Sequence, residues 1–348
     1  MTLGDALLLL VAFLLGCGVA YAVKFYAERL DLVDIPNHRS SHKTSTPSGG
    51  GMGIVLGGTV AGISLVLLKG VEPFLWFAII FLSLIIAILG LADDTRNVSA
   101  KVRFSIQLVS VVAMLLTFHQ LPDLSLPFSI SASGLILLFL ILFAAVWWIN
   151  LFNFMDGIDG IAAMQAIFML LAAAGLSIVG QLGSEPPALF WWMLCLAAAN
   201  LGFLLLNWAP AKIFMGDVGS TYLGFMIIAL ALLSLQAGML SYQVWLILAA
   251  TFLTDATVTL LTRLLRGERV YEAHRSHSYQ RLTRHWGRHS SVTLIFFGIN
   301  VIWLLPLALF AVVWPQWNWE FVLIAYAPLI VAAATLGAGR QDKRNSSY

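Results

Sequence analysis

About eleven stretches of this chain are apolar over the roughly 17–25 residues that a helix needs to cross a lipid bilayer. The composition agrees, because 60% of the residues are hydrophobic and only 10% are charged, unlike an ordinary soluble domain. The chain is therefore predicted to be an all-α polytopic membrane protein, with residues 1–348 forming one membrane-embedded domain. The expected spans are 4–23, 51–68, 74–92, 102–118, 133–151, 158–178, 187–207, 218–237, 242–262, 291–313 and 319–337.

The first apolar stretch is interpreted as a membrane helix and not as a cleaved signal peptide. A secretory signal needs a basic flank, whereas this one has no Lys or Arg before the apolar run and carries Asp5. Cys17 and Cys195 both fall within apolar spans, so cysteine says nothing about the cellular compartment.

The basic residues predict the orientation, because cytoplasmic loops retain Lys and Arg while translocated loops are depleted of them. When the spans alternate from an outside N-terminus, all 19 Lys and Arg residues except Lys69 fall on one side. The N-terminus is therefore expected in the periplasm and the C-terminus in the cytoplasm. The cytoplasmic loops that would carry a site are 24–50, 92–102, 150–158, 208–218 and 263–290.

Asp93 and Asp94 end the third span on this inner side. A helix C-terminus carries partial negative charge, so two carboxylates there are misplaced by roughly 0.3–1 kcal/mol each. Something positive should offset them. Basic residues of the following loop could do so, but a bound divalent cation or a proton-accepting role explains the pair better.

Four polar side chains recur every three residues between the fifth and sixth spans, namely Asn150, Asn153, Asp156 and Asp159. In a straight helix, residues three positions apart point about 60° apart around the helix axis. Asn150 and Asp159 would therefore face opposite sides. Glycines at 157 and 160 allow a break, with the asparagines ending one helix and the aspartates beginning the next. Helix capping would use one aspartate and leaves the other polar groups unexplained.

Asp217 precedes the eighth span in the segment Lys212 to Gly219 and is a candidate metal ligand. Capping of that helix is the alternative. Oxygen ligands without cysteine, and without paired histidines, favour Mg²⁺ or Mn²⁺ over Zn²⁺.

Cations accompany these acids, as phosphoryl transfer requires. The loop 36–50 combines Arg39 and His42 with a glycine run that lets backbone N–H groups approach a phosphate. The loop 263–290 carries His274, Arg275 and His277 among arginines that could simply anchor the protein to anionic lipid. Asp255, slightly inside the membrane, is either functional or part of a helix–helix hydrogen bond.

These motifs resemble the polyprenyl-phosphate N-acetylhexosamine-1-phosphate transferases, the family that contains the MraY- and WecA-type enzymes. The resemblance runs in order from about residue 28 to 285. It is carried by Pro36-Asn37-x-Arg39-x-x-His42, Pro47, Gly50-Gly51, Asp93-Asp94, Asn153-x-x-Asp156-Gly157-x-Asp159-Gly160, Gly216-Asp217-x-Gly219 and a histidine-bearing last loop.

The resemblance implies transfer of a sugar-1-phosphate from a UDP-amino-sugar to undecaprenyl phosphate, releasing UMP, with Mg²⁺ as cofactor. The enzyme would work at the cytoplasmic face of a bacterial inner membrane. By position, Asn153 and Asp217 resemble the metal ligands, Asp93 the base that deprotonates the lipid phosphate, and Asp94 and Asp156 further active-site acids. Asp159 would help to hold the nucleotide. The implied substrate-binding residues are Arg39, His42, Asn150, Lys212, His274, Arg275 and His277.

The last loop departs from the family pattern. WecA-type relatives carry His-x-His-His there, whereas this chain has His277-Ser278-Tyr279-Gln280, with His274 three residues earlier. The sugar is therefore expected to be N-acetylglucosamine or a 6-deoxy relative such as N-acetylfucosamine, in an enzyme that initiates O-antigen or a related envelope glycan.

A secondary transporter is the alternative from another class. Transporters bind substrate near the bilayer midplane in paired repeats, whereas these acids lie at inner helix ends and no repeat is apparent. A CDP-alcohol phosphotransferase would need a different aspartate motif, because Asp156-Gly157 continues here as Ile158-Asp159-Gly160. No nucleic-acid partner is expected, and a homodimer is compatible with the sequence.

Overall fold

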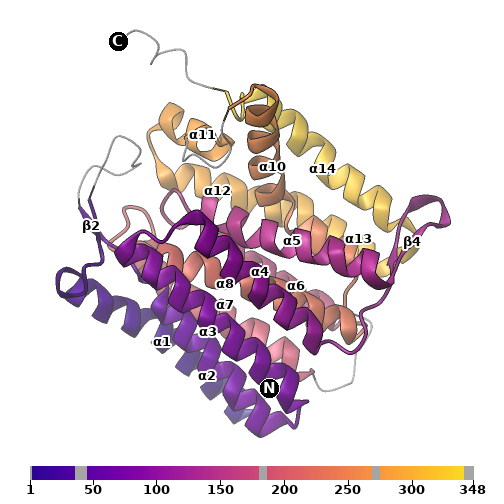
Figure 1. The fold of residues 1–348 in the computed structure, drawn as a ribbon, viewed down its shortest axis with the longest axis horizontal. Helices are drawn as coiled ribbons and strands as arrows, with labels where there is room; N and C mark the ends of the chain where they lie inside the picture. The colour runs from indigo at the N-terminus through magenta and orange to yellow at the C-terminus, as the bar shows by residue number, and fades with distance from the viewer. Residues whose placement is uncertain (1, 36–44, 180–185, 269–274, 341–348) are drawn as a thin grey trace.

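The computed structural model describes residues 2–35, 45–179, 186–268 and 275–340, and within them the chain is a bundle of apolar helices (Figure 1). Nine helices of this described part are long and apolar enough to span a membrane. A further apolar helix, α6, is slightly shorter, with 17 residues. The helices α9 and α10 together are also apolar enough to make one more span, although the pair is bent. Each of the eleven predicted spans therefore coincides with apolar helix, while the number of crossings and their orientation stay predictions.

The helices of the first half are α1 (Leu3–Tyr26), α2 (Met52–Lys69), α3 (Pro73–Arg96), α4 (Ala100–Thr117), α5 (Gly134–Phe154) and α6 (Ile161–Ser177). Those of the second half are α7 (Ala188–Asn207), α8 (Gly216–Gln236), α9 (Tyr242–Leu248), α10 (Ala250–Leu265), α11 (Ser278–Trp286), α12 (His289–Ile299), α13 (Leu305–Val313) and α14 (Asn318–Thr335). The short helical turns are η1 (Ala27–Leu30), η2 (Pro127–Ser129), the π-helical η3 (Asn300–Leu304) and η4 (Pro315–Trp317).

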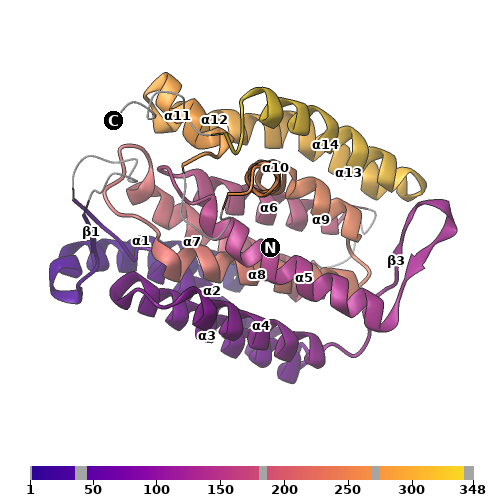
Figure 2. The ribbon, with the colours of Figure 1, turned by 45° about the horizontal axis from the view of Figure 1, so that its top comes forward.

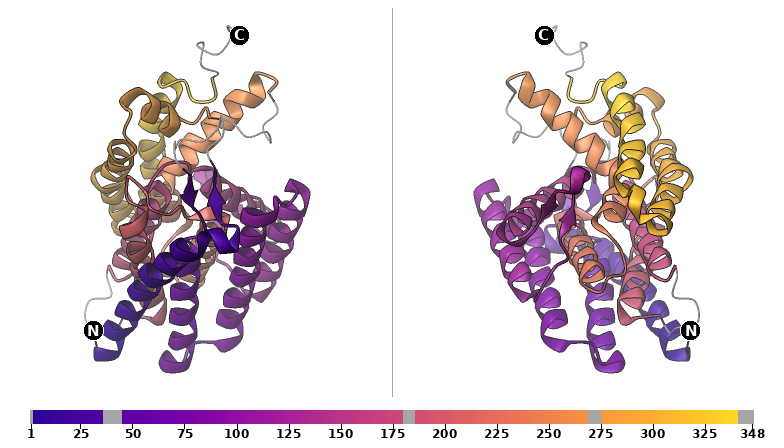
Figure 3. Two further views of the ribbon diagram at one scale, coloured as in Figure 1. Left: turned by 90° about the vertical axis from the view of Figure 1, so that its left-hand side faces the viewer. Right: turned by 90° about the vertical axis from the view of Figure 1, so that its right-hand side faces the viewer.

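Two small antiparallel hairpins lie at the two ends of the bundle (Figure 2). At one end β1 (Val33–Asp34) pairs with β2 (Thr46–Pro47), with Val33 opposite Pro47. At the other end β3 (Leu124–Ser125) pairs with β4 (Ser131–Ala132), with Leu124 opposite Ala132. The start of α1 and the end of α14 also lie at opposite ends of the bundle, as an odd number of crossings would require (Figure 3).

The helix α8 forms the centre of the bundle. In its most apolar 18-residue window 94% of the residues are buried, compared with 22% for α1. Glycines let neighbouring helices come close to it. A Cβ at Gly90 of α3 would lie 2.5 Å from the Asp217 carbonyl carbon and 2.6 Å from the Val218 nitrogen. Small residues of this kind permit close helix crossings in a membrane, where lipid supplies no hydrophobic drive. This crossing brings the end of α3 against the start of α8.

The span expected at 242–262 is wrong as a single straight helix. The chain bends by 74° between α9 and α10, and α10 is seen almost end-on in Figure 2 while its neighbours run across the view. No proline or glycine marks the break. Instead, the Gln165 side chain of α6 donates a hydrogen bond to the Leu248 carbonyl at 3.1 Å. This bond satisfies a carbonyl at the break in the buried interior, where an unpaired polar group is costly.

Candidate active site

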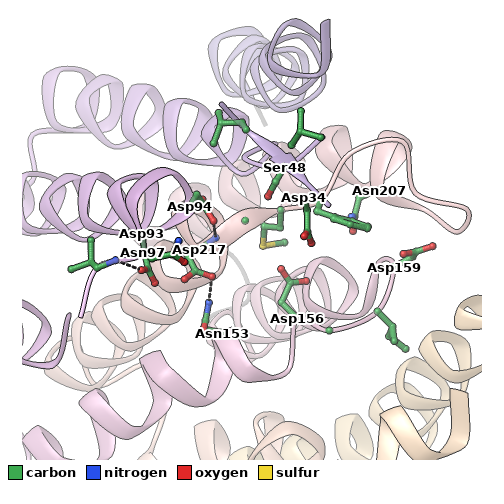
Figure 4. A pocket seen from close by; sticks show the side chains of 18 of the residues that line it. Asp34, Ser48, Asp93, Asp94, Asn97, Asn153, Asp156, Asp159, Asn207 and Asp217 are labelled. Atoms are coloured by element: carbon green, nitrogen blue, oxygen red, sulfur yellow. Dashed lines mark hydrogen bonds between the residues drawn. The ribbon is translucent and has the colours of Figure 1, made fainter. Parts of the chain in front are cut away.

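A cavity of about 660 Å³ opens at the end of the bundle where α3, α5 and α8 meet the β1–β2 hairpin (Figure 4). Its walls combine the acidic segments that the sequence singled out with residues of β1 and the residue that follows β2. The lining residues are Leu32, Val33, Asp34, Ser48, Asp93, Asp94, Asn97, Val98, Arg103, Asn153, Asp156, Gly157, Ile158, Asp159, Asn207, Phe214, Met215, Gly216, Asp217, Gln280 and His289.

Arg103 of α4 forms an ion pair with Asp93 of α3, and its Nη1 atom lies 3.5 Å from an oxygen of Asp217 at the start of α8. The second carboxylate oxygen of Asp93 accepts the backbone N–H of Val98 at 2.7 Å. Two carboxylates from different helices therefore converge on one cation. The sequence interpretation counted Arg103 only among charges that might neutralise a loop and missed this position inside the site.

Asp94 has a different partner, although it follows Asp93 directly. Its two carboxylate oxygens accept the backbone N–H groups of Asp217 at 2.8 Å and Val218 at 3.1 Å. It thereby caps the N-terminus of α8, where the helix dipole is positive. Asp93 is thus offset by Arg103, a basic residue as in the alternative that the sequence left open, and Asp94 is offset by the positive end of α8.

The segment between α5 and α6 breaks as the sequence predicted, but Asp156 and Asp159 lie in the turn and do not begin the next helix. Helix α5 ends at Phe154 and α6 begins at Ile161, with Gly160 at a positive φ of 76°. Neither aspartate caps α6, because its N-cap Gly160 has no side chain to offer. Asn153, at the end of α5, donates its amide to Asp217 Oδ1 at 2.7 Å and to Ser220 Oγ at 2.9 Å.

Asp156 lies between these groups and the far end of the cavity (Figure 4). Burial raises the pKa of this carboxyl well above its ordinary value, and the nearby charges of Asp217, Asp94 and Asp159 raise it further. A carboxyl whose ionised form is disfavoured in this way will either hold a proton or attract a cation.

Asp159 and Asn207 form the far end of the cavity, opposite Asp93 and Asp217 (Figure 4). The Asp159 carboxylate accepts the Ala211 N–H at 3.1 Å and lies 3.1 Å from Nδ1 of His289. Asn207 accepts the Gly160 N–H and donates to the Ile213 carbonyl, both at 3.0 Å. These bonds hold the 156–160 turn against the chain that leads into α8.

Several residues predicted to bind substrate lie outside this lining. Asn150 donates its amide to the Gln107 side chain of α4 at 2.7 Å, and Lys212 is exposed. Arg275 accepts a hydrogen bond from Arg284 through its backbone carbonyl. His277 is only 2% exposed. The predicted residues Arg39, His42 and His274 lie outside the described residues.

His277 belongs instead to a contact between α10 and α11. Its Nδ1 atom lies 3.6 Å from Asp255, whose carboxylate accepts the N–H groups of Ser278 at 2.8 Å and Tyr279 at 3.0 Å. Asp255 thus stabilises the start of α11 and joins two helices, which is the hydrogen-bonding alternative that the sequence left open.

The sequence reasoning also missed Gln280, His289, Asn207 and Phe214, which line the cavity. Gln280, His289 and Asn207 are single polar residues outside any acidic cluster of the sequence. Phe214 is an apolar residue close to the acidic segment around Asp217. Only their place in the folded chain marks them.

The chain was compared with known proteins. The sequence profile described as glycosyl transferase family 4 matches residues 76–235. The chain is 31% identical over 323 residues to the probable undecaprenyl-phosphate N-acetylglucosaminyl 1-phosphate transferase of Bacillus subtilis, covering 90% of this chain and 87% of that protein. It is 29% identical over 277 residues to the undecaprenyl-phosphate alpha-N-acetylglucosaminyl 1-phosphate transferase of Escherichia coli K12, covering 74% and 71%.

A third relative has a different substrate in its name. The phospho-N-acetylmuramoyl-pentapeptide-transferase of Streptococcus pneumoniae CGSP14 is 27% identical over 292 residues, covering 77% of this chain and 85% of that protein. The profile match spans α3 to α8 and therefore contains most of the cavity's acidic residues.

Proposed function

Because the chain belongs to glycosyl transferase family 4, we propose that it transfers an N-acetylhexosamine-1-phosphate from a UDP-sugar to undecaprenyl phosphate. The products are undecaprenyl-diphosphate-sugar and UMP. The observation that carries this proposal is the position of Arg103 between Asp93 and Asp217, at one end of a cavity large enough for a nucleotide-sugar. Acids and a cation held together are what phosphoryl transfer requires.

A divalent cation fits the residues at this end, and we propose Mg²⁺, or Mn²⁺ in its place. The donors available are the carboxylate of Asp217 and the amide oxygen of Asn153, the hard ligands that these ions prefer. The Arg103 guanidinium already lies where positive charge is favoured. The described residues contain no ready-made group of three or more His, Cys, Asp or Glu side chains arranged to hold a metal, so substrate phosphate would complete the coordination. When bound, the ion would neutralise the diphosphate of the donor.

The other steps of the proposed reaction depend on residues of the chain itself. Arg103 can exchange its ion pair with Asp93 for one with a substrate phosphate. The Asp93 carboxylate is then free to act as the base toward the lipid phosphate. Asp156 is suited to hold a proton, because burial and the neighbouring carboxylates raise its pKa well above that of an ordinary aspartate. A phosphate monoester has a second pKa of about 6, so little basicity is needed to ionise it fully. Asp94 holds α8, and thereby Asp217, in place.

The proposed sugar is N-acetylglucosamine or a 6-deoxy relative such as N-acetylfucosamine, and the proposed product serves O-antigen or a related envelope glycan. Two relatives named as N-acetylglucosaminyl 1-phosphate transferases support the first choice. We further propose that the cavity faces the cytoplasm from a bacterial inner membrane, which the one-sided distribution of Lys and Arg supports.

The test measures UMP release by membranes that contain the protein, given undecaprenyl phosphate, Mg²⁺ and each of a panel of UDP-amino-sugars. We expect one or two sugars to support release, and Asp217→Asn to reduce it at least a hundredfold. Asp123→Asn serves as the matched control, because Asp123 is exposed beside the hairpin at the opposite end of the bundle. Full activity of Asp217→Asn, or ion-coupled solute uptake without UMP release, would contradict the proposal.

A further inference from the structure

His289 is the one histidine among the described residues that lines the cavity. It begins α12, and no sequence motif pointed to it. We propose that His289, rather than His277, is the histidine of this site, and that its Nε2 atom contacts the part of the UDP-sugar donor that does not react. This inference rests on the proposed function.

The geometry at His289 leaves one ring nitrogen for a ligand. Its Nδ1 atom lies 3.1 Å from Asp159 Oδ1 and 3.3 Å from the Asp159 backbone nitrogen. A neutral ring can donate to the carboxylate or accept from the N–H through this nitrogen, but cannot do both. In either tautomer Nδ1 is used by Asp159. Nε2 is the nitrogen that remains, as an acceptor in the first case and as a donor in the second.

The ring is also held in place by contacts behind it. Thr293, one turn further along α12, donates its hydroxyl to the Asp159 carbonyl at 3.0 Å and is only 1% exposed. The other carboxylate oxygen of Asp159 accepts the Ala211 N–H. Asp159 is therefore fixed on three sides, and the side chain that it orients is positioned before any ligand arrives.

His277 is unsuited to the same task. It is almost fully buried, its ring stacks on Tyr279 with centroids 5.6 Å apart, and its Nδ1 faces Asp255. Its side chain ties α10 to α11 and does not line the cavity, although Gln280, which accepts the His277 backbone N–H at 3.3 Å, does. The side chain at the first histidine position of the family pattern is thus structural here. Gln280, at the last of those positions, lines the cavity together with a histidine from the following helix.

The chemistry of this end of the cavity identifies the part of the donor that it can recognise. The end with Arg103 suits the diphosphate, because it holds a cation. At the far end the ring nitrogen of His289 and the amide of Asn207 accompany the Asp159 carboxylate, with no Arg or Lys among the described lining residues there. This mixture repels phosphate and suits hydroxyl and amide groups. Both the nucleoside and the N-acetylated sugar carry such groups.

The experiment compares His289→Ala, His289→Gln and His289→Asn in the full-length protein. The readouts are the KM values for the UDP-sugar that the wild type uses and for undecaprenyl phosphate, together with the Kd of UMP. We expect His289→Ala to raise the donor KM about three- to tenfold, as the loss of one hydrogen bond would, and to leave the lipid KM unchanged. The glutamine amide can place its nitrogen, as a donor, or its oxygen, as an acceptor, at the position of Nε2, whereas the asparagine amide reaches only the position of Nδ1. His289→Gln should therefore recover more donor affinity than His289→Asn.

His119→Ala is the matched control and should leave the donor KM unchanged, because His119 is an exposed histidine that follows α4 and does not line the cavity. Weaker UMP binding in His289→Ala places the nucleoside at His289, whereas unchanged UMP binding with a raised donor KM places the sugar there; both uphold the proposal. An unchanged donor KM, or better recovery by asparagine than by glutamine, overturns it. The proposed function fails separately, if the wild type releases no UMP with any UDP-sugar.

Discussion

Alanine at Gly157 should displace the active-site turn, because the fully buried Tyr279 occupies the space that a side chain would need. A Cβ there would overlap the Tyr279 hydroxyl oxygen and lie 3.0 Å from the ring carbon that bears it. Gly157 is not among the glycines of the described chain that have a positive φ, so the penalty is steric. Overpacking of this kind costs about 1–3 kcal/mol. Because Asp156 is the adjacent residue, UMP release should fall as well.

Phenylalanine at position 279 provides the decisive comparison. Alone, Tyr279→Phe removes the hydrogen bond from the hydroxyl to the Phe154 carbonyl, 3.0 Å away, and should cost about 0.5–1.5 kcal/mol. In the double variant the missing hydroxyl relieves the overlap. We expect Gly157→Ala/Tyr279→Phe to be at least as stable as Gly157→Ala, with a coupling free energy of at least about 0.5 kcal/mol.

The assay is unfolding of the purified protein in mild detergent, with UMP release measured on the same samples. Gly175→Ala is the matched control, because a Cβ at Gly175 of α6 meets no atom within 4 Å. Additive losses in the double variant, or equal effects of alanine at Gly157 and Gly175, would refute the steric argument.

Three further variants test the acidic end of the site. Arg103→Gln should bind Mg²⁺ roughly fivefold more tightly, because it removes a competing ion pair that is 37% exposed on the arginine side and worth about 1 kcal/mol; calorimetry showing equal or weaker binding would contradict this. Asp94→Asn should lose about 1.5–3 kcal/mol of stability with its charged hydrogen bonds to α8, and a wild-type unfolding midpoint would exclude the capping role. The raised pKa of Asp156 favours its protonated form, so the metal-free protein should lose stability as the pH rises above about 4, where the unfolded chain ionises. Asp156→Asn should reduce the dependence of the free energy of unfolding on pH. The same pH dependence in both proteins would contradict the raised pKa of Asp156.

The sequence predicted the helices well, because length and apolarity are local properties. It did not predict the bend at Ala249, since the apolar run 242–262 is continuous and contains no glycine or proline. At the bend the Leu248 carbonyl accepts a hydrogen bond from Gln165, a buried residue of another helix. Tertiary contacts of this kind leave no periodic signal in the segment that they break.

The acidic clusters were predictable as a group, but their separate roles were not. Asp93 and Asp94 look equivalent in the sequence, yet consecutive helical residues point about 100° apart, so one faces Arg103 and the other faces α8. His289 was missed because a lone histidine at a helix start carries no pattern. His277 was assigned by resemblance, whereas the structure buries it against Asp255.

The most direct test of the proposed reaction follows the β-phosphorus of the donor. Membranes containing the protein receive undecaprenyl phosphate, Mg²⁺ and the accepted UDP-sugar, labelled with one isotope in the sugar and another in the β-phosphate. Transfer of a sugar-1-phosphate predicts that both labels enter the lipid in equal amounts while unlabelled UMP remains in the aqueous phase. Sugar label in the lipid with the β-phosphate left in UDP would show transfer of the sugar alone and contradict the account.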